Sequence, residues 1–392
     1  MSESATELTP SNVLWDFSRY VIAAVAVGGI IWYCFFYTPI TYVSREAAGQ
    51  TMGTDYIVKV AQFPENADWN EVKSAIQNRL DALDQMMSTY KSDSEVCRFN
   101  AFASTEDWFP VSPETASVIQ TALEISRFSE GAFDITVAPL VRHWGFGADG
   151  NSRQTQSFEE LASAAIPIKE AIGYQKLSVR LEPPALKKAI PELAIDLSAI
   201  AKGFAVDCIA EFLEKQNITD YLIEVGGEVC GKGKKTKGKD WIDKYPILAK
   251  IAELLGKSKK TKDKDWIVGI EKPVLESPHV FPGLQRTLTL TDQSLATSGN
   301  YRQTILIGDH QVSHLIDGRT GLPAQTQSDA GELAATAVIF SDCTRADAWA
   351  TALFVLGEQK GAELADQHGI AVLFLLRNGK ETIEVSSKHW AK

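Results

Sequence analysis

The chain has 392 residues, of which 45% are apolar, 9% aromatic and 23% charged, a composition typical of folded globular proteins and not of disordered or collagen-like ones. Its 39 Lys and Arg stand against 50 Asp and Glu, and the net charge of −11 disfavours nucleic acid as a partner. The five cysteines form no CxxC pair, so the sequence supports neither a disulfide framework nor a thiolate zinc site.

The first predicted element is a membrane anchor. Residues 20–44 carry no charge and lie between Arg19 and Arg45, and as a helix they would extend about 37 Å at roughly 1.5 Å per residue, enough to cross a bilayer. A cleaved signal peptide is the alternative, but its apolar region would be shorter and would end at a small-residue cleavage site. We therefore expect an N-terminal tail at 1–19, a transmembrane anchor at 20–44 and a folded domain at 50–392.

The body after the anchor combines helices and strands in an irregular order. Residues 55–60 alternate like a strand, and apolar residues from Val72 to Met87 recur at helical spacing. Further helices are predicted from Pro113 to just before Gly131 and after Ser198. Strands are predicted at 221–225, 267–271, 286–291, 303–307, 335–340, 371–376 and 381–385. This order, which ends in a hairpin, favours an α+β fold over a doubly wound parallel sheet.

One segment stands apart by its charge. Residues 234–242 (KKTKGKDWI) recur 25 residues later as 259–267 (KKTKDKDWI), and residues 232–264 hold 12 Lys against four Asp or Glu. Two copies are too few for a stacked repeat array, which needs at least three. We interpret the segment at about 232–265 as a solvated surface insertion between two strands. A docking patch for an acidic partner or for lipid headgroups is the alternative.

The stretch 194–203 (AIDLSAIAKG) predicts a strand that runs through Asp196 into the N-terminus of a helix. Free backbone N–H groups and the positive end of the helix dipole favour an anion at such a terminus, and Lys202 in the first turn adds a full positive charge. Two interpretations stay open. The stretch holds a pyrophosphate, or it is an ordinary strand-to-helix turn with Asp196 as the helix cap.

Residues 346–354 (ADAWATALF) predict a helix up to Gly357, in which Asp347 and Thr351 lie on the same face. Their apolar surroundings predict burial, and a buried carboxylate needs a partner. A hard cation such as Mg²⁺, with oxygen ligands from Asp, a hydroxyl and a backbone carbonyl, would be such a partner. Pairing of Asp347 with Arg345 or with a buried Lys is the structural alternative.

A strand followed by a glycine-rich turn is predicted at 314–321 (HLIDGRTG), where it would present His314 beside Asp317 and Arg319. A lone His is more often structural than catalytic, so both roles stay open at this point. The chain contains no GxxxxGK[ST], no GxGxxG after a strand, no HExxH and no GxSxG. The common nucleotide-triphosphatase, dinucleotide-fold, zinc-protease and serine-hydrolase functions therefore lack sequence support.

Taken in order, eight motifs resemble those of the ApbE family of flavin transferases, the FAD:protein FMN transferases. They are residues 52–54 (MGT), 88–100 (STYKSDSEVCRFN), 131–145 (GAFDITVAPLVRHWG), 196–203, 224–227 (EVGG), 298–299 (SG), 314–321 and 346–351. The implied fold is a single T-fold-like α+β body of mixed, largely antiparallel sheets with helices, preceded by one transmembrane helix. Gly318 departs from the family, which commonly has Pro at that position.

The resemblance also implies roles for individual residues. The residues expected at the FAD site are Met52, Tyr90, Ala132, Phe133, Asp134, Asp196, Lys202 and Leu315. Either Tyr90 or Phe133 would pack near the flavin or adenine ring. The Mg²⁺ ligands would be Asp347, Thr351 and the carbonyl group near Ala199, and the catalytic residues would be His314, Asp196 and Lys202.

The implied reaction is the Mg²⁺-dependent transfer of FMN from FAD to a Thr or Ser hydroxyl of a target protein, with release of AMP. The family typically acts outside the bacterial cytoplasmic membrane on subunits of redox pumps such as the sodium-pumping NADH:quinone reductase. The resemblance thus implies a single-pass inner-membrane protein with its catalytic body on the periplasmic side. Hydrolysis of FAD to FMN and AMP, and a non-catalytic membrane-tethered FAD-binding protein, are the alternatives.

Overall fold

The computed structural model describes residues 42–147, 156–235, 264–273, 283–300, 304–379 and 381–390, together with Val25. The chain divides into two compact units, the larger of which comprises residues 44–63, 68–237 and 262–392. In the smaller unit, which comprises residues 1–43, 64–67 and 238–261, the structure describes only Val25, Tyr42, Val43 and residues 64–67. The elements below belong to the larger unit, apart from the outer ends of two strands.

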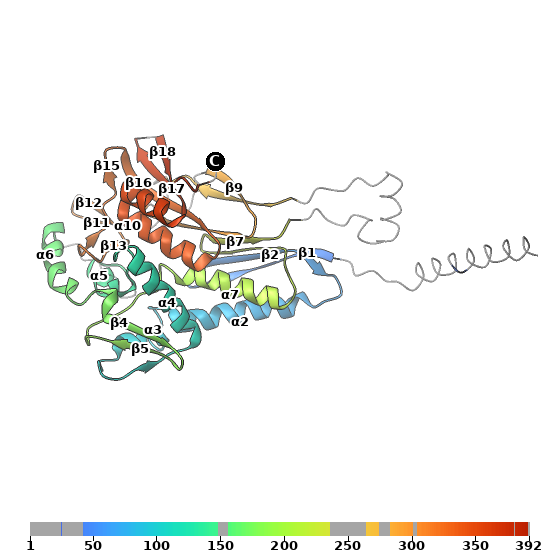
Figure 1. The fold of residues 1–392 in the computed structure, drawn as a ribbon, viewed down its shortest axis with the longest axis horizontal. Helices are drawn as coiled ribbons and strands as arrows, with labels where there is room; N and C mark the ends of the chain where they lie inside the picture. Colours follow the sequence, from blue (N-terminus) through green and yellow to red (C-terminus); the bar gives the residue numbers. More distant parts are fainter. Residues whose placement is uncertain are drawn as a thin grey trace, which may run out of the picture. The chain divides into compact units, whose positions relative to one another are not determined.

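A nine-stranded sheet forms the centre of the larger unit (Figure 1). Its strands follow the order β1-β2-β6-β7-β10-β16-β17-β18, and β15 also pairs with β16. Their bounds are Tyr42–Thr51, Thr54–Pro64, Tyr221–Val225, Glu228–Lys232, Gln293–Gly299, Gly331–Phe340, Ala371–Asn378, Glu381–Ser386 and, for β15, Gln327–Ser328. The pairings from β2 to β18 are antiparallel.

The two faces of this sheet bury different sets of residues. Strand β17 shows the period of two most clearly: Val372, Phe374 and Leu376 pack into the core shared with the helices, whereas Leu373 and Leu375 pack on the opposite face. The second face is covered by the β8–β9 hairpin, whose strands span Trp266–Glu271 and Leu284–Leu290. Burial of alternate residues on both faces explains why β17 reads as a continuous apolar run.

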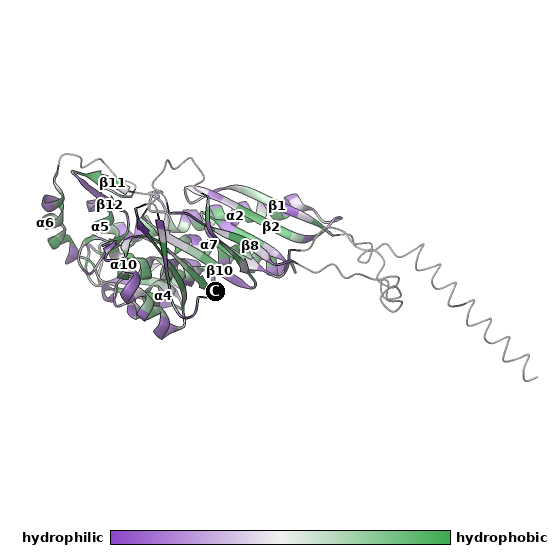
Figure 2. Ribbon diagram, turned by 90° about the horizontal axis from the view of Figure 1, so that it is seen from above, coloured by the Kyte–Doolittle hydropathy of each residue, from purple (hydrophilic) through white to green (hydrophobic). Residues whose placement is uncertain are grey.

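Helices cover the first face, and α10 and α7 pack directly on the sheet and on each other. Figure 2 shows hydrophobic and hydrophilic residues mixed along helices such as α4 and α6, as expected of amphipathic surface helices. The α-helices are α2 (Trp69–Met87), α3 (Glu95–Ala101), α4 (Pro113–Phe128), α5 (Ala138–His143), α6 (Phe158–Lys169), α7 (Ala201–Lys215) and α10 (Cys343–His368). Helix α10 is interrupted at Gly357, whose φ of 78° is not helical.

Three smaller sheets complete the described part of the fold, besides the β8–β9 hairpin. They are β3-β5-β4 (Phe109–Pro110, Pro184–Lys188 and Leu177–Leu181), β11-β12 (Thr304–Ile307 and His310–Ser313) and β13-β14 (Ile316–Asp317 and Leu322–Pro323). The last two flank His314, which lies in the short link between β12 and β13.

The predicted α+β body with largely antiparallel sheets is confirmed. The strand predicted to run through Asp196 is wrong, because residues 193–197 form no strand and the backbone of Ile195 pairs with the Asn100 side chain instead. The other helices and strands predicted above for the body are present, with boundaries that shift by a few residues. The largest boundary error concerns β1, which begins at Tyr42 and so includes the last three residues of the predicted transmembrane span and precedes the predicted domain start at residue 50. The central strands β7 and β10 were not predicted, because their small residues and glycines give no clear strand pattern.

The rest of the predicted span, apart from Val25, lies outside the described residues, as does most of the Lys-rich insertion. Among the residues that the structure does describe, no helix is long and apolar enough to cross a membrane. The insertion leaves the body after β7 and returns at β8, and its two ends are bridged by antiparallel hydrogen bonds between Lys235 and Lys264. An ion pair between Lys234 and Asp265 reinforces this closure.

Candidate active site

Helices α7 and α10 cross so closely that only glycine fits between them. A Cβ atom at Gly203 would lie 2.7 Å from the carbonyl carbon of Cys343 and 2.8 Å from the Cβ atom of Asp347, and even closer to the Cys343 carbonyl oxygen. At this contact the backbone N–H of Gly203 donates a hydrogen bond of 3.0 Å to Oδ2 of Asp347. The carboxylate of Asp347 therefore caps the N-terminus of α7, whose own N-cap residue, Ile200, contributes no side-chain hydrogen bond.

The same contact brings together three charged groups, two of which are buried. The Lys202 ammonium lies 2.7 Å from Oε1 of Glu228 and 3.7 Å from Oδ1 of Asp347, and both carboxylate side chains are only 3% exposed. Burial disfavours the charged form of Lys202, but attraction to Asp347 and Glu228 outweighs this effect and holds its pKa above the usual value. Burial raises the pKa of Glu228 to about 7, against the opposing effect of Lys202.

One tight turn of the sheet packs against the stem of the Lys202 side chain, and a second turn packs against the first. Gly226 opens the β6–β7 turn with φ 62°, and a Cβ atom there would lie 3.0 Å from Cδ of Lys202 and 2.8 Å from Cγ2 of Thr54. Thr54 follows the β1–β2 turn, in which Met52 and Gly53 both have positive φ, 49° and 71°. A positive φ is unusual for a residue such as Met52 and is typical of two-residue hairpin turns. The motifs at 52–54, 202–203 and 224–227 therefore meet at Gly226, beside the stem of the Lys202 side chain.

Oxygen groups that suit a hard cation gather beside this ammonium. Asp347 and Thr351 lie one turn apart on α10, and the Thr351 hydroxyl is 2.8 Å from the hydroxyl of Ser298 on β10. Oε2 of Glu228 is buried and has no hydrogen-bond partner in the described part of the chain. Asp347 and Thr351 offer a carboxylate and a hydroxyl oxygen on one helix face, and this donor set fits Mg²⁺. Groups of three or more His, Cys, Asp or Glu arranged for a metal do not occur among the described residues.

Asp196 does not cap α7, so the structural alternative considered for it was wrong. Its Oδ1 accepts hydrogen bonds from the backbone N–H and the hydroxyl of Ser198, at 2.8 and 2.5 Å. Its own N–H donates to the carbonyl of Ile135 at 2.7 Å. The side-chain amide of Asn100 pairs with both backbone groups of Ile195, at 2.8 and 2.9 Å. Asn100 thereby fixes the segment that presents Asp196.

Asp134 is used within the protein. Its Oδ1 accepts from the N–H and hydroxyl of Thr136, and its Oδ2 accepts from the N–H of Tyr174 at 2.8 Å. Burial raises the pKa of Asp134, although these hydrogen bonds oppose the shift. Ala132 and Phe133 are 3% and 2% exposed and belong to the hydrophobic core. In this conformation Asp134 binds the backbone of the turn, and Phe133 packs in the core beneath the turn.

The two aromatic candidates for a ring contact differ sharply in exposure. Tyr90 is 70% exposed, whereas Phe133 is buried in the core. Of the two, Tyr90 presents its ring to a ligand without any rearrangement. Leu315, at 7% exposure, is also a core residue, and its carbonyl accepts a hydrogen bond from the N–H of Ala324 at 2.8 Å.

The loop that carries His314 is held rigidly against the 131–137 turn. Asp317 binds the Arg319 side chain through both carboxylate oxygens, at 2.8 and 2.9 Å. The indole N–H of Trp144 donates to the carbonyl of Gly321 at 2.9 Å. A Cβ atom at Gly318 would lie 3.1 Å from Cγ1 of Val137. Glycine, where the family commonly has proline, therefore lets the loop approach the 131–137 turn closely. The ring of His314 packs edge-on against Phe146, with centroids 6.2 Å apart.

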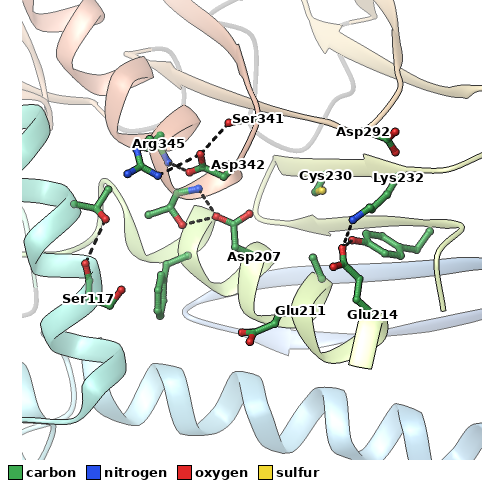
Figure 3. A pocket seen from close by; sticks show the side chains of 15 residues that line it. Ser117, Asp207, Glu211, Glu214, Cys230, Lys232, Asp292, Ser341, Asp342 and Arg345 are labelled. Carbon is green, nitrogen blue, oxygen red and sulfur yellow. Dashed lines mark hydrogen bonds and ion pairs between the residues drawn. The ribbon is translucent and has the colours of Figure 1, made fainter. Parts of the chain in front are cut away.

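Asp207 lies one turn after Gly203 on the same face of α7 and binds the start of α10. Its two oxygens accept from the N–H groups of Cys343 and Thr344, at 2.9 and 2.8 Å, and from the Thr344 hydroxyl at 2.5 Å. A cavity of about 480 Å³ is lined by Asp207, Glu211, Glu214 and Asp342, among other residues. Figure 3 shows these side chains around the cavity. Lys202, Asp347 and Thr351 do not line this acidic cavity, so it is distinct from the predicted FAD site.

Comparison with known proteins identifies the family to which these motifs belong. The sequence matches the ApbE family over residues 52–243 and 250–374. The chain belongs to the ApbE family. The resemblance inferred from the eight motifs is thus confirmed.

Relatives in the ApbE family match most of the chain. The FAD:protein FMN transferases of Vibrio cholerae serotype O1 and Escherichia coli K12 are 34% and 33% identical to it, over 84% of this chain and 86% and 84% of theirs. The structure of flavin transferase ApbE from Vibrio cholerae covers 89% of this chain and 98% of its own length, with a TM-score of 0.71 and 32% identity. The apo Pseudomonas stutzeri flavinyl transferase ApbE gives a TM-score of 0.70 at 30% identity, over 89% and 96%.

Sequence reasoning missed three residues that organise this ApbE site: Gly203 as a helix-crossing residue, Asp207 and Glu228. The motif at 224–227 stopped one residue short of Glu228, although an acid directly after a Gly-Gly turn was a visible signal. Asp347 does pair with a buried Lys, as the structural alternative proposed, but its other oxygen binds the backbone of α7. Arg345, the other partner considered, pairs with Asp342 and Glu124 instead.

Proposed function

We propose that this chain transfers FMN from FAD to a Thr or Ser hydroxyl of a target protein, releasing AMP, in a Mg²⁺-dependent reaction. The observation that carries the proposal is the ion pair between Lys202 and the buried Asp347 at the N-terminus of α7, in a chain of the ApbE family. An ammonium group at the positive end of a helix dipole suits a pyrophosphate. The proposed ligands for Mg²⁺ are Asp347, Thr351 and the carbonyl of Ala199.

The reaction exchanges one phosphoester bond for another. The acceptor hydroxyl oxygen attacks the FMN-side phosphorus of FAD, the bond from that phosphorus to the bridging oxygen breaks, and AMP leaves with that oxygen. When bound, Mg²⁺ supplies neutralisation of charge on the phosphate oxygens. Lys202 holds the pyrophosphate and offsets its charge, and the turn at Gly226 packs against the Lys202 stem. Positioning and charge neutralisation therefore supply most of the rate.

In this proposal His314 takes the proton of the acceptor hydroxyl. The support is its place in a short link fixed by the Asp317–Arg319 pair and by Trp144, which limits the freedom of the ring. Tyr90 stacks on a ring of FAD, since its side chain is exposed. Asp196 and the turn at 132–134 line the same ligand.

The proposed acceptors are subunits of redox complexes such as the sodium-pumping NADH:quinone reductase. We place the body on the periplasmic side of the bacterial inner membrane, anchored by the apolar segment that begins at residue 20. Hydrolysis of FAD by water is the second candidate, because it would use the same cluster with water as acceptor. A non-catalytic FAD-binding protein is disfavoured, since binding alone does not require Asp347 and Thr351 together.

The test mixes the full chain with FAD, Mg²⁺ and a candidate acceptor and weighs the acceptor for one added FMN. Asp347→Ala should abolish transfer and lower the free energy of unfolding by about 1 to 3 kcal/mol, because the N–H of Gly203 loses its partner. Undiminished transfer by this variant in Mg²⁺ would contradict the metal assignment. His314→Ala should lower the transfer rate by about 10² to 10⁴-fold with much less effect on FAD affinity. Equal losses in rate and affinity would make His314 a packing residue. Release of FMN and AMP without acceptor would favour hydrolysis.

A further inference from the structure

Glu228 is a buried acid with no role in the reaction proposed above. It opens strand β7 directly after the Gly226-Gly227 turn and is 2% exposed. One of its oxygens, Oε1, accepts a hydrogen bond from Lys202, while Oε2 finds no hydrogen-bond partner within the described ranges. Glu228 and Asp347 thus share a single ammonium group, and an unpaired carboxylate oxygen remains in the site.

Packing limits where the Lys202 ammonium can go. The side-chain stem passes the β6–β7 turn so closely that a Cβ atom at Gly226 would lie 3.0 Å from its Cδ atom. From there the ammonium reaches Oε1 of Glu228 at 2.7 Å and Oδ1 of Asp347 at 3.7 Å. Only the first distance is that of a hydrogen bond. Lys202 is therefore bound to Glu228 and makes only a longer-range ion pair with Asp347.

The preference of Lys202 for Glu228 matters for metal binding. Oδ2 of Asp347 already accepts from the N–H of Gly203, so Oδ1 is the oxygen with the greater capacity for a cation. An ammonium bound directly to Oδ1 would compete with Mg²⁺ for it, and in a buried site that attraction is little screened by water or salt.

We propose that Glu228 is a positioning residue, which holds the Lys202 ammonium and thereby keeps Oδ1 of Asp347 available to Mg²⁺. This inference rests on the proposed function, because it takes Asp347 to be a Mg²⁺ ligand. Glu228 itself binds neither the metal nor FAD in this arrangement. Its effect is transmitted through Lys202 alone.

Two substitutions separate this role from a simple effect of charge. Glu228→Gln keeps the length of the side chain and removes its charge, whereas Glu228→Asp keeps the charge and withdraws it from Lys202 by one methylene group. We expect both to raise the Kd for Mg²⁺ at least tenfold, measured by titration calorimetry on the full chain with and without FAD. FAD affinity without Mg²⁺, followed by flavin fluorescence, should change less than threefold. A normal Kd in Glu228→Asp would show that charge alone matters and would overturn the proposal.

A double variant keeps the test decisive even if Glu228→Asp does not fold. Adding Lys202→Met to Glu228→Gln removes the competing ammonium, so the Kd for Mg²⁺ should return to within threefold of the wild-type value although transfer is lost. A Kd that stays as high as in Glu228→Gln would refute the mechanism. Glu214→Gln weakens a second ion pair between α7 and β7, that of Glu214 with Lys232, and is the matched control that should leave Mg²⁺ binding unchanged.

The outcomes also separate this inference from the proposed function. Wild-type protein that binds Mg²⁺ and transfers FMN, with Glu228 variants of unchanged Mg²⁺ affinity, would overturn the role of Glu228 only. Wild-type protein that transfers FMN without binding Mg²⁺ would overturn the metal assignment and the inference together.

Discussion

The substitution Gly203→Ala tests how closely α7 and α10 cross. Helix propensity alone predicts that alanine stabilises α7 by about 1 kcal/mol relative to glycine. The crossing predicts the opposite, because the added Cβ atom would lie 2.7 Å from the Cys343 carbonyl carbon. Carbon atoms pack favourably at about 3.5 to 4.0 Å, so the two backbones would have to separate by about 0.8 Å or more.

The expected loss of stability depends on which atoms must move to make room for the new Cβ atom. The obstacle is the backbone of α10, not the flexible end of a side chain, so we take the upper part of the usual range for overpacking, about 3 kcal/mol. Subtracting the propensity gain leaves a net destabilisation of about 2 kcal/mol. Separation of the helices would also lengthen the 3.0 Å hydrogen bond from Gly203 to Asp347 and move that carboxylate away from Lys202.

Urea unfolding followed by circular dichroism measures the change in the free energy of unfolding, and FMN transfer measures the change at the site. We expect Gly203→Ala to lose about 2 kcal/mol and most of its transfer activity. Glu211→Ala, on the exposed side of the same helix, is the control and should change stability by less than about 0.5 kcal/mol. If Gly203→Ala were as stable as the wild type, helix propensity would outweigh the contact and the close crossing would be wrong.

Three further predictions follow from individual groups. Because the Tyr90 ring is 70% exposed, Tyr90→Ala should leave thermal stability unchanged and weaken FAD binding roughly fivefold, the equivalent of about 1 kcal/mol of stacking, whereas Tyr90→Phe should retain affinity in the same fluorescence titration. Burial raises the pKa of Asp207 from 3.8 to about 6, so the folded state holds this proton more tightly, and the resulting stability, complete below pH 3.8, is lost as the pH rises through 6. Urea unfolding across pH 4 to 6 should show this loss, about 3 kcal/mol at most, in the wild type but not in Asp207→Asn. Deletion of residues 241–265 joins two matching repeat ends, so folding and FAD binding should survive. FMN transfer to a peptide and to the full acceptor protein, assayed side by side, should both persist. Loss of transfer to the full acceptor alone would make the insert a docking element.

The sequence was informative wherever the signal was local. Caps, turns and apolar periodicity located α2, α4 and the β17–β18 hairpin, and the motif order identified the family. The pairings that build the site are not local: Lys202 and Glu228 are separated by 26 positions, and Asp207 and Cys343 by 136. Spacing along the chain contains no information about such pairs. Strand β1 was missed for a different reason, since its first residues continue the apolar run of the predicted span.

The same long-range pairing explains how the fold fixes the site. Asp347 of α10 accepts from the N–H of Gly203 in the first turn of α7, and Asp207 of α7 accepts from the N–H of Cys343 in the first turn of α10. In each helix the capping acid lies four residues after the residue whose N–H is capped, so each helix supplies a cap for the other across a contact that has no room for a Cβ atom. Because both helix ends are bound in this way, a shift of either helix breaks hydrogen bonds at two buried positions, at a cost of about 1 to 3 kcal/mol for each group left unpaired. The placement of Asp347 relative to Lys202 is therefore a property of the helix crossing, and substitutions there should affect metal binding and stability together.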